Sequence, residues 1–502
     1  MSLSRAPGQV RAPYHEHPAP RPWLTLGLVS AGLFLAVTST TVVSVALPGI
    51  SVGLHAGATG LEWVVDAYAL VYATLLMPAG SLGDRLGRKG LFVTGIALFA
   101  LGALGCGLAG SVAELLAARV VQGAGSALAV SCSLTIIRVS FEDERRRATA
   151  IGIWSTSSGV ALAVGPPLGG ILASAFGWRG VFFALAPAAA ATAIAGTRWI
   201  PPLERVRSPG TFDWVGAALS ALVPAALSFG AIEGQAQGWT SAIVLAAFGT
   251  GAAALAAFIP WELARQAPLV DVRLFRRRAF TAANLAALVI FFAFVGAIVY
   301  FSVYFQQLQH RSAVAAGLDV SAIGIAYAIV ATLTGKVLHR TGERLPMVVG
   351  LLAAGAATLG LLRLSASTSV GAIWWNFALL GAAIGLCGTP ISTIAMSSVD
   401  QRRAGMASGV VNAARQLGQA FGIAVLGALV FAYLPAASST GPIDPAQAPL
   451  FVAGLHSALR VAGVSLLVAG AAVAAMTRRP RAPATIVRDD TASQAITGGG
   501  TR

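Results

Sequence analysis

Long apolar runs, separated by short polar segments, follow one another through most of this chain. A membrane-spanning helix needs about 20 consecutive apolar residues, and this pattern predicts an all-α polytopic membrane protein with 14 spans. An even number of spans places both termini on one side of the membrane. The runs cover residues 24–47, 62–82, 90–109, 112–137, 149–172, 180–199, 213–233, 239–260, 280–304, 317–338, 345–364, 371–397, 405–432 and 452–476.

The composition excludes most other classes of protein. Of the 502 residues, 56% are hydrophobic and 11% are charged, and the mean hydropathy is +0.76. Soluble proteins carry about 25% charged residues, and a soluble fold could not bury so many apolar side chains. The 3 cysteines are too few for a disulfide framework.

The net charge of +15 permits two interpretations, a nucleic-acid partner or the excess of basic residues in cytoplasmic loops. With the N-terminus in the cytoplasm, 28 of the 34 Lys and Arg residues fall in cytoplasmic tails or loops. This asymmetry predicts two cytoplasmic termini and no nucleic-acid partner. Only two basic residues are lysine, which is typical of a GC-rich bacterial genome, so we expect a bacterial inner membrane. Three basic residues lie inside spans: Arg119, Arg415 and Arg460.

Polar breaks after the sixth and eighth runs suggest how the chain is divided. The Pro-rich start leads into a run that is too long for a signal peptide, which favours an uncleaved tail. Nine of the ten tryptophans lie near span ends, as in an aromatic belt, and Trp154 is the exception. The predicted parts are a cytoplasmic N-tail (1–23), a six-helix bundle (24–199), a linker with two extra helices (200–279), a second six-helix bundle (280–476) and a disordered C-tail (477–502).

The most specific motif, Gly80–Lys89, follows the second run. Gly80 would let a neighbouring helix approach closely, and Gly87 can adopt positive φ in a tight loop. Asp84 can accept hydrogen bonds from a helix N-terminus or pair with an arginine. The simplest alternative is a basic hairpin with an incidental acid. The segment resembles the loop between helices 2 and 3 of the major facilitator superfamily at every marked position.

Further segments carry this resemblance along about residues 24–476. Arg119–Gly125 is similar to a superfamily motif in the fourth helix. The fifth run resembles the antiporter motif, which is more typical of exporters than of importers, with Ala161 in place of its second glycine. The glycines would permit close helix crossing and the proline would bend the span, although simple packing explains such residues equally well. The matching residues are Gly152, Gly165, Pro166, Gly169 and Gly170.

Several other stretches resemble the 14-helix drug:proton antiporter branch, including 41–48, 63–68, 268–275, 304–307 and 405–418. Two departures affect function. Ser39 stands where the branch usually carries an aspartate, and Ser44 replaces an asparagine. The second half repeats the loop motif at 335–342 in a degenerate form, with His339 where the first half has Asp84.

Ionisable groups within a span are expensive, and each one suggests a functional site. We expect Asp66 to serve proton coupling or cation recognition, the alternative being a solvated or packing carboxylate. The resemblance implies that Arg119 acts in a proton relay or organises the cavity, the alternative being a structural role. Asp84, Arg85 and Arg88, with Gly80 and Gly87, would form a gate at the cytoplasmic side. The cavity candidates are Ser39, Ser44, Gln122, Asn412 and Arg415.

The resulting prediction is a secondary active exporter of small hydrophobic or amphiphilic drugs or antibiotics, driven by proton antiport through alternating access. Its selectivity would depend on cavity shape and on aromatic positions such as Phe291, Phe292, Phe294 and Tyr300. We expect a monomer in the lipid bilayer. The proton gradient would supply the energy, so we expect no cofactor, and ATPase, metal and hydrolase motifs are missing from the sequence. The alternatives are an exporter or permease of an endogenous metabolite with weak or no proton coupling, and a non-transporting membrane sensor.

Overall fold

The computed structural model describes residues 21–56, 58–202, 212–266, 268–400, 403–434 and 445–477. This part of the chain contains helices and no strand. Almost all of the predicted N-tail and C-tail lies outside it. The long helices are α1 (Pro22–Leu54), α2 (Ala58–Leu86), α3 (Arg88–Leu108), α4 (Val112–Ser140), α5 (Glu144–Trp199), α6 (Trp214–Gln237), α7 (Ala242–Ala264), α8 (Arg278–Val303), α9 (Ala313–Thr341), α10 (Arg344–Gly360), α11 (Val370–Ser397), α12 (Ala404–Phe431) and α13 (Ala448–Met476).

Short helical turns lie between or at the ends of these helices. The 3-10 turns are η1 (Val272–Arg276), η3 (Leu361–Arg363) and η6 (Pro445–Gln447), and α8 continues into one π turn, η2 (Tyr304–Leu308). Within the described residues, 13 helices are long and apolar enough to cross a membrane. Twelve correspond to one predicted run each, and α5 combines the runs 149–172 and 180–199.

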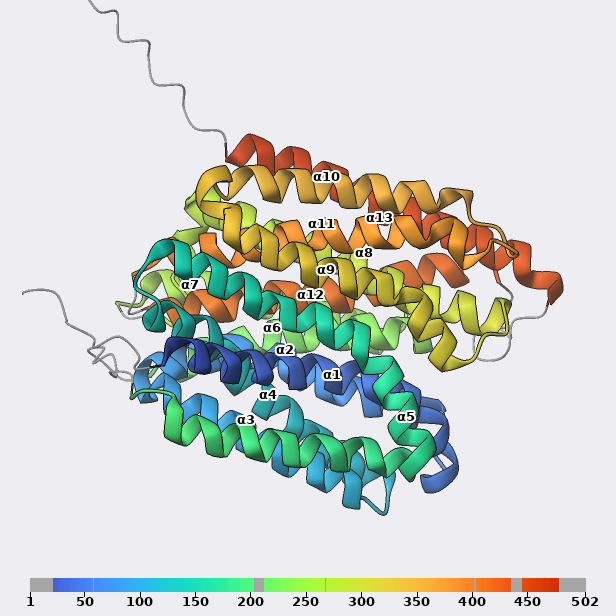
Figure 1. Cartoon of the computed structure of the whole chain (residues 1–502), viewed down its shortest axis with the longest axis horizontal. Coiled ribbons are helices and arrows are strands. Elements are labelled where there is room, and N and C mark those ends of the chain that lie inside the picture. Colours follow the sequence, from blue (N-terminus) through green and yellow to red (C-terminus); the bar gives the residue numbers. More distant parts are fainter. Residues whose placement is uncertain are drawn as a thin grey trace, which may run out of the picture.

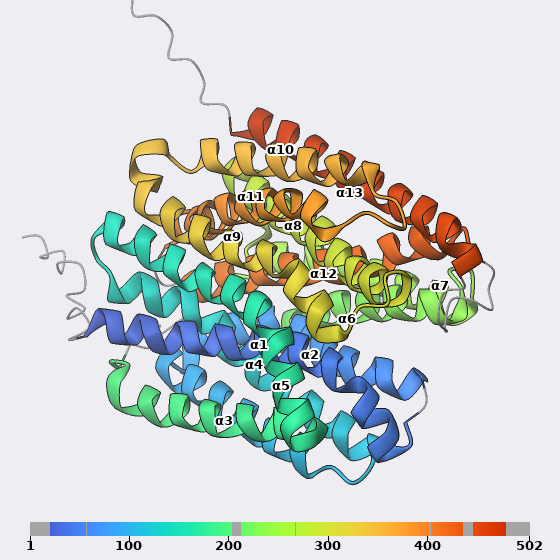
Figure 2. The ribbon, with the colours of Figure 1, turned by 45° about the vertical axis from the view of Figure 1, so that its right-hand side comes forward.

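Helix α5 has 56 residues, which at 1.5 Å per residue makes about 84 Å of helix, nearly twice the thickness of a bilayer. The helical conformation is interrupted at Gly177, where φ is 70° and ψ is 176°. The teal first part and the green second part run in opposite directions (Figures 1 and 2). The 13 helices therefore make 14 crossings, which confirms the predicted fold.

The crossings form two bundles that lie side by side. The blue-to-green helices α1 to α5 make one bundle, and the yellow-to-red helices α8 to α13 make the other (Figure 1). Across the boundary, α5 packs along α9 and α2 packs along α12, while the inserted helix α6 contacts both α2 and α12. The described chain begins and ends at the same end of the molecule (Figures 1 and 2). We call this the terminal end, and the other the opposite end.

Glycines bring the two bundles together. A Cβ atom on Gly80 would lie 2.3 Å from the carbonyl oxygen of Gly405. A Cβ atom on Gly335, in the degenerate repeat, would lie 2.8 Å from the carbonyl oxygen of Ala148 and 3.0 Å from Cα of Gly152. The α2–α12 and α9–α5 crossings are therefore two copies of one arrangement, as expected for an internally repeated transporter.

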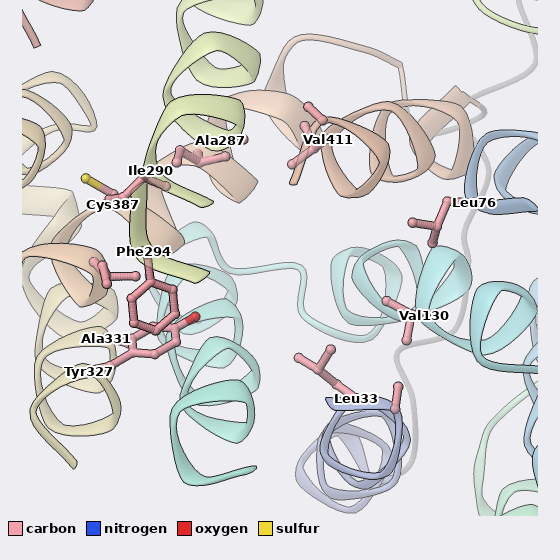
Figure 3. Packing of buried hydrophobic residues seen from close by; sticks show 14 of the residues in the cluster. Leu33, Leu76, Val130, Ala287, Ile290, Phe294, Tyr327, Ala331, Cys387 and Val411 are labelled. Carbon is pink, nitrogen blue, oxygen red and sulfur yellow. The ribbon is translucent and has the colours of Figure 1, made fainter. Parts of the chain in front are cut away.

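Between these crossings the buried residues are mainly apolar. The cluster includes Leu33, Leu76 and Val130 from the first bundle and Ile290 and Phe294 from the second (Figure 3). Dispersion contacts of this kind stabilise the bundles, while polar side chains gather at a few places within them.

Candidate functional site

At the terminal end, the carboxylate of Asp84 joins the two bundles. Its Oδ1 lies 3.1 Å from Nε of Arg88, in an ion pair within the first bundle. The same carboxylate accepts hydrogen bonds from the backbone N–H groups of Gly405, at 3.2 Å, and Met406, at 3.3 Å. These groups belong to the first turn of α12, whose N-terminus carries a partial positive charge. Asp84 is only 8% exposed, so the interactions are largely shielded from water.

The turn that follows explains how Arg88 reaches this carboxylate. Gly87 adopts φ 105° and ψ 122°, which confirms the expected positive φ. A residue with a side chain rarely adopts this conformation. The chain therefore turns sharply out of α2, and Arg88 begins α3 as a buried residue beside Asp84.

Other contacts across the terminal end reinforce this junction. Arg138 of α4 donates a hydrogen bond to the backbone carbonyl of Met396 in α11. Ser81 of α2 donates to the carbonyl of Leu269, at 2.9 Å. Arg85, also predicted for the gate, lies with its guanidinium 5.5 Å from the ring centre of Phe212. The predicted gate residues therefore meet the second bundle and the segments next to α6 and α7.

The degenerate copy of the motif lacks this carboxylate bridge. His339 stands at the corresponding place near the end of α9, and its side chain is exposed. The packing role of Gly335 is retained, and the charged role of Asp84 has no counterpart at His339. The two bundles are therefore related in packing but differ in the chemistry of their terminal-end contacts.

A second polar cluster surrounds Arg119, which is 0% exposed in α4. Its Nε donates to the carbonyl of Val64, at 2.8 Å, and its Nη1 donates to Ser39 Oγ, at 2.9 Å, and to Gln122 Oε1, at 2.8 Å. Its Nη2 has no hydrogen-bond partner among the described residues. The guanidinium carbon also lies 4.4 Å from the ring centre of Tyr68. The site thus brings together three predicted residues, Ser39, Arg119 and Gln122.

Asp66 belongs to the same neighbourhood. It is half-buried in α2, and it is one of the groups that interact electrostatically with Arg119. The buried hydroxyl of Tyr68, two residues further on, donates to the carbonyl of Ala36 at 2.8 Å and lies 2.7 Å from Ser126 Oγ. Helices α1, α2 and α4 are therefore linked by one network next to Asp66.

The antiporter-motif residues of α5 pack against two neighbouring helices. A Cβ atom on Gly165 would lie 2.1 Å from Thr41 Oγ1 of α1, and one on Gly169 would lie 3.1 Å from Val42. On the other side, Pro166 packs near Gly317 of α9. Pro166 and Gly170 lie within α5, whose conformation is interrupted eleven residues after Pro166, at Gly177. The motif therefore holds α5 between α1 and α9.

Ser44 lies apart from the Arg119 cluster. Its side chain is exposed, and its hydroxyl donates to the carbonyl of Thr41 in the same helix, at 2.7 Å. The predicted cavity residues are therefore distributed over separate places in the structure.

A third polar cluster surrounds Arg415, about midway along α12. Its Nη1 donates to Asn412 Oδ1 at 3.2 Å. Its Nη2 donates to Ser392 Oγ at 2.8 Å and contacts the carbonyl oxygen of Gly388 at 3.5 Å, both in α11. The guanidinium carbon lies 5.9 Å from the ring centre of Trp154, which belongs to the other bundle.

Sequence reasoning proposed Asn412 and Arg415 but missed Ser392 and Trp154. A signal for Trp154 was present, because it alone among the tryptophans lies away from a span end. Nothing in the sequence distinguishes Ser392 from the many other serines inside spans. Only the packing of α11 on α12 places it beside Arg415.

The comparisons with known proteins agree with this architecture. The model of the Major Facilitator Superfamily matches residues 29–423, which is more than half of the chain. The chain belongs to the major facilitator superfamily. It is a multi-pass membrane transporter and not an enzyme.

Curated relatives match over most of their lengths. The chain is 36% identical over 417 residues to the multidrug resistance protein Stp of Mycobacterium tuberculosis, covering 82% of this chain and 76% of that protein. It is 33% identical over 427 residues to the tetracenomycin C resistance and export protein of Streptomyces glaucescens, covering 85% and 78%. It is 34% identical over 408 residues to the methylenomycin A resistance protein of Streptomyces coelicolor, covering 80% and 84%.

A solved structure shows the same fold. The human organic anion transporter MFSD10 (TETRAN) matches with a TM-score of 0.64 and 17% identity, covering 90% of this chain and 100% of that chain. At this identity the likeness concerns the fold alone.

Proposed function

We propose that this transporter exports small hydrophobic or amphiphilic compounds, drugs or antibiotics among them, from a bacterial cell in exchange for protons. The relatives above are named for multidrug resistance, for antibiotic resistance or for export, which supports the direction and the substrate class. The excess of Lys and Arg at the terminal end supports a cytoplasmic location for that end, in the inner membrane.

The observation that carries the alternating-access part of the proposal is the bridge formed by Asp84. Its carboxylate belongs to one bundle and accepts hydrogen bonds from the first turn of α12 in the other. Opening the terminal end requires these hydrogen bonds to break. The bridge therefore stabilises the state that is closed at this end, which is the property of a gate. The predicted bundles 24–199 and 280–476 would move as units, with the pair in 200–279 beside them.

Proton coupling is proposed to use Asp66 and Arg119. Ser39 takes the place of the usual aspartate and cannot carry a proton load, so Asp66 is the nearby carboxyl group that can. Protonating Asp66 would remove a negative charge from the neighbourhood of Arg119. The buried guanidinium would then depend more strongly on Ser39, Gln122 and the carbonyl of Val64. A change in this network is transmitted to α1, α2 and α4, which together provide its partners.

The test is ethidium transport in everted membrane vesicles that contain the full chain, energised by a proton gradient. Wild type should accumulate ethidium, and a protonophore should abolish this accumulation. Asp66→Asn should lose the gradient-driven component at equal expression. Glu114→Gln is a matched control, because Glu114 is an exposed acid of α4. Its Oε2 accepts a hydrogen bond from the backbone N–H of Gly110 at 2.7 Å.

The outcomes separate the parts of this proposal. Normal gradient-driven transport by Asp66→Asn would remove Asp66 from the coupling mechanism. Transport by wild type that ignores the protonophore would exclude proton antiport. If wild type moves neither ethidium nor any antibiotic in a test panel, the drug assignment fails and an endogenous metabolite becomes the better substrate class.

A further inference from the structure

The surroundings of Arg415 leave a half-buried positive charge that has no negative partner among the described residues. Arg415 lies eleven residues after the start of α12, about 16 Å along a helix of about 42 Å. None of the ion pairs among the described residues includes it, and its hydrogen bonds go to the neutral acceptors Asn412, Ser392 and Gly388. A guanidinium in the middle of a membrane protein is costly unless an anion or strong acceptors compensate its charge.

Several hydrogen-bond donors next to this charge also lack acceptors. Nε of Arg415 has no partner among the described residues, and the same holds for Nε1 of Trp154 and Oγ of Ser155. Trp154 is 1% exposed and Ser155 is 2% exposed, so water at the surface does not satisfy them. An arginine N–H and an indole N–H can only donate. The unmet requirement at this place is therefore for an acceptor, preferably one with a negative charge.

Aromatic groups from both bundles surround the same place. The guanidinium carbon lies 5.9 Å from the ring centre of Trp154 in α5 and 5.7 Å from that of Phe291 in α8. Tyr327 of α9 directs its hydroxyl toward the ribbon of α5 (Figure 3). A Cβ atom built on Gly388 would lie 3.6 Å from that hydroxyl and 3.8 Å from Ser155 Oγ, so these groups face one another across a glycine.

We propose that this cluster, defined by Arg415, Trp154, Ser155, Phe291 and Tyr327, binds an acidic aromatic compound. The carboxylate or phenolate of the compound would accept from Arg415 Nε, Trp154 Nε1 and Ser155, and its flat ring system would lie against Phe291. This inference rests on the proposed export function and names its substrate class. Because the two bundles both contribute, the ligand would bind where alternating access requires a substrate to bind.

A structural brace is the competing explanation. The hydrogen bonds from Arg415 to Asn412, Ser392 and Gly388 do hold α12 against α11. They satisfy Nη1 and Nη2 with neutral acceptors only, and they leave Nε without a partner. A brace also gives no reason for the unpaired indole N–H of Trp154, which lies in the opposite bundle.

The test compares two dyes with the same three-ring skeleton and opposite charge, fluorescein and rhodamine 123. Their affinities are measured by fluorescence anisotropy on the purified full chain, and their transport is measured in the vesicles described above. Arg415→Gln should weaken fluorescein binding roughly tenfold or more, since it removes charge-assisted hydrogen bonds. It should leave rhodamine binding unchanged or tighter. Arg415→Lys should give an intermediate fluorescein affinity, because it keeps the charge but not the planar set of donors.

Two further variants keep the test independent of folding defects. Trp154→Phe keeps an aromatic ring and removes the N–H donor, so it should weaken fluorescein severalfold and leave rhodamine unchanged. Arg460→Gln removes another positive charge from a span, at an exposed position for which the structure describes no hydrogen bond or ion pair. It should change neither affinity. Arg415→Lys and Trp154→Phe decide the matter if Arg415→Gln does not fold.

The results that overturn the inference are equally definite. Equal weakening of both dyes by Arg415→Gln would support the brace, and a wild type that does not bind fluorescein would exclude the anion site. Failure of the export proposal looks different. In that case the vesicles would transport neither dye nor ethidium, while fluorescein binding by the purified protein would still depend on Arg415.

Discussion

Replacing Asp84 by asparagine should open the terminal end of the transporter. Asparagine keeps the size of the side chain and one acceptor, but it removes the negative charge. The ion pair with Arg88 is lost, and the hydrogen bonds from Gly405 and Met406 lose their charge assistance. A hydrogen bond to a charged group contributes about 1.5–3 kcal/mol, and a partly buried charge at a helix end contributes up to about 2 kcal/mol.

These contributions overlap, because the same carboxylate makes all of them. A net loss of about 2 kcal/mol from the closed state is therefore expected, close to a thirtyfold change in the ratio of closed to open molecules. The ion pair with Arg88 lies within the first bundle, so it and the hydrogen bonds within each bundle are present in both states and do not change this ratio. The expected effect is consequently a shift in population and not unfolding.

Pulsed electron paramagnetic resonance can measure this shift as a change in the distance between two spin labels, one on each bundle. Leu86→Cys at the end of α2 and Ser397→Cys at the end of α11 are both exposed sites at the terminal end. The buried native cysteines, Cys106, Cys132 and Cys387, are replaced first. In Asp84→Asn, the longer label-to-label distances should gain population.

Glu142→Gln is the matched control, since Glu142 is an exposed acid at the same end of the molecule. It should leave the distance distribution unchanged. If Asp84→Asn also leaves the distribution unchanged, and transports ethidium at the wild-type rate, the bridge is not a gate and the argument from charge fails.

Three other substitutions test the packing of the two bundles, the Arg119 cluster and the backbone conformation at the interruption of α5. Gly80→Ala places a Cβ about 2.3 Å from a backbone oxygen of α12, so it should widen the same spin-label distances without removing any charge. Ser39→Ala deprives the buried Arg119 of an acceptor, so in thermal denaturation it should lower the free energy of unfolding by about 1–3 kcal/mol. Ser174→Ala is the control, because this exposed serine is bonded only within its own helix, and it should change the free energy of unfolding little. Gly177→Ala forces a side chain onto a backbone with φ 70° and ψ 176°, and should destabilise the protein by about 1–3 kcal/mol in the same assay.

Sequence alone was sufficient for features that depend on a local stretch of chain. A run of about 20 apolar residues crosses a bilayer whatever lies beside it, and the 14 predicted crossings appear in the structure. Gly87 and its positive φ belong to the same class, because the turn after α2 requires a residue without a side chain. The separate runs 149–172 and 180–199 belong to this class too, because the helical conformation of α5 is interrupted between them at Gly177.

The partners of the charged residues required the tertiary structure. The sequence marked Arg119 and Arg415 as unusual, because charges inside spans are costly, and it marked Asp84 through the motif Gly80–Lys89. It could not show that Asp84 faces the first turn of α12, 321 residues away, or that Trp154 lies beside Arg415. The physical reason is that a polar group in a membrane is compensated by whichever helix packs against it. That helix is selected by the packing of all the crossings together, and no single segment of the chain encodes it.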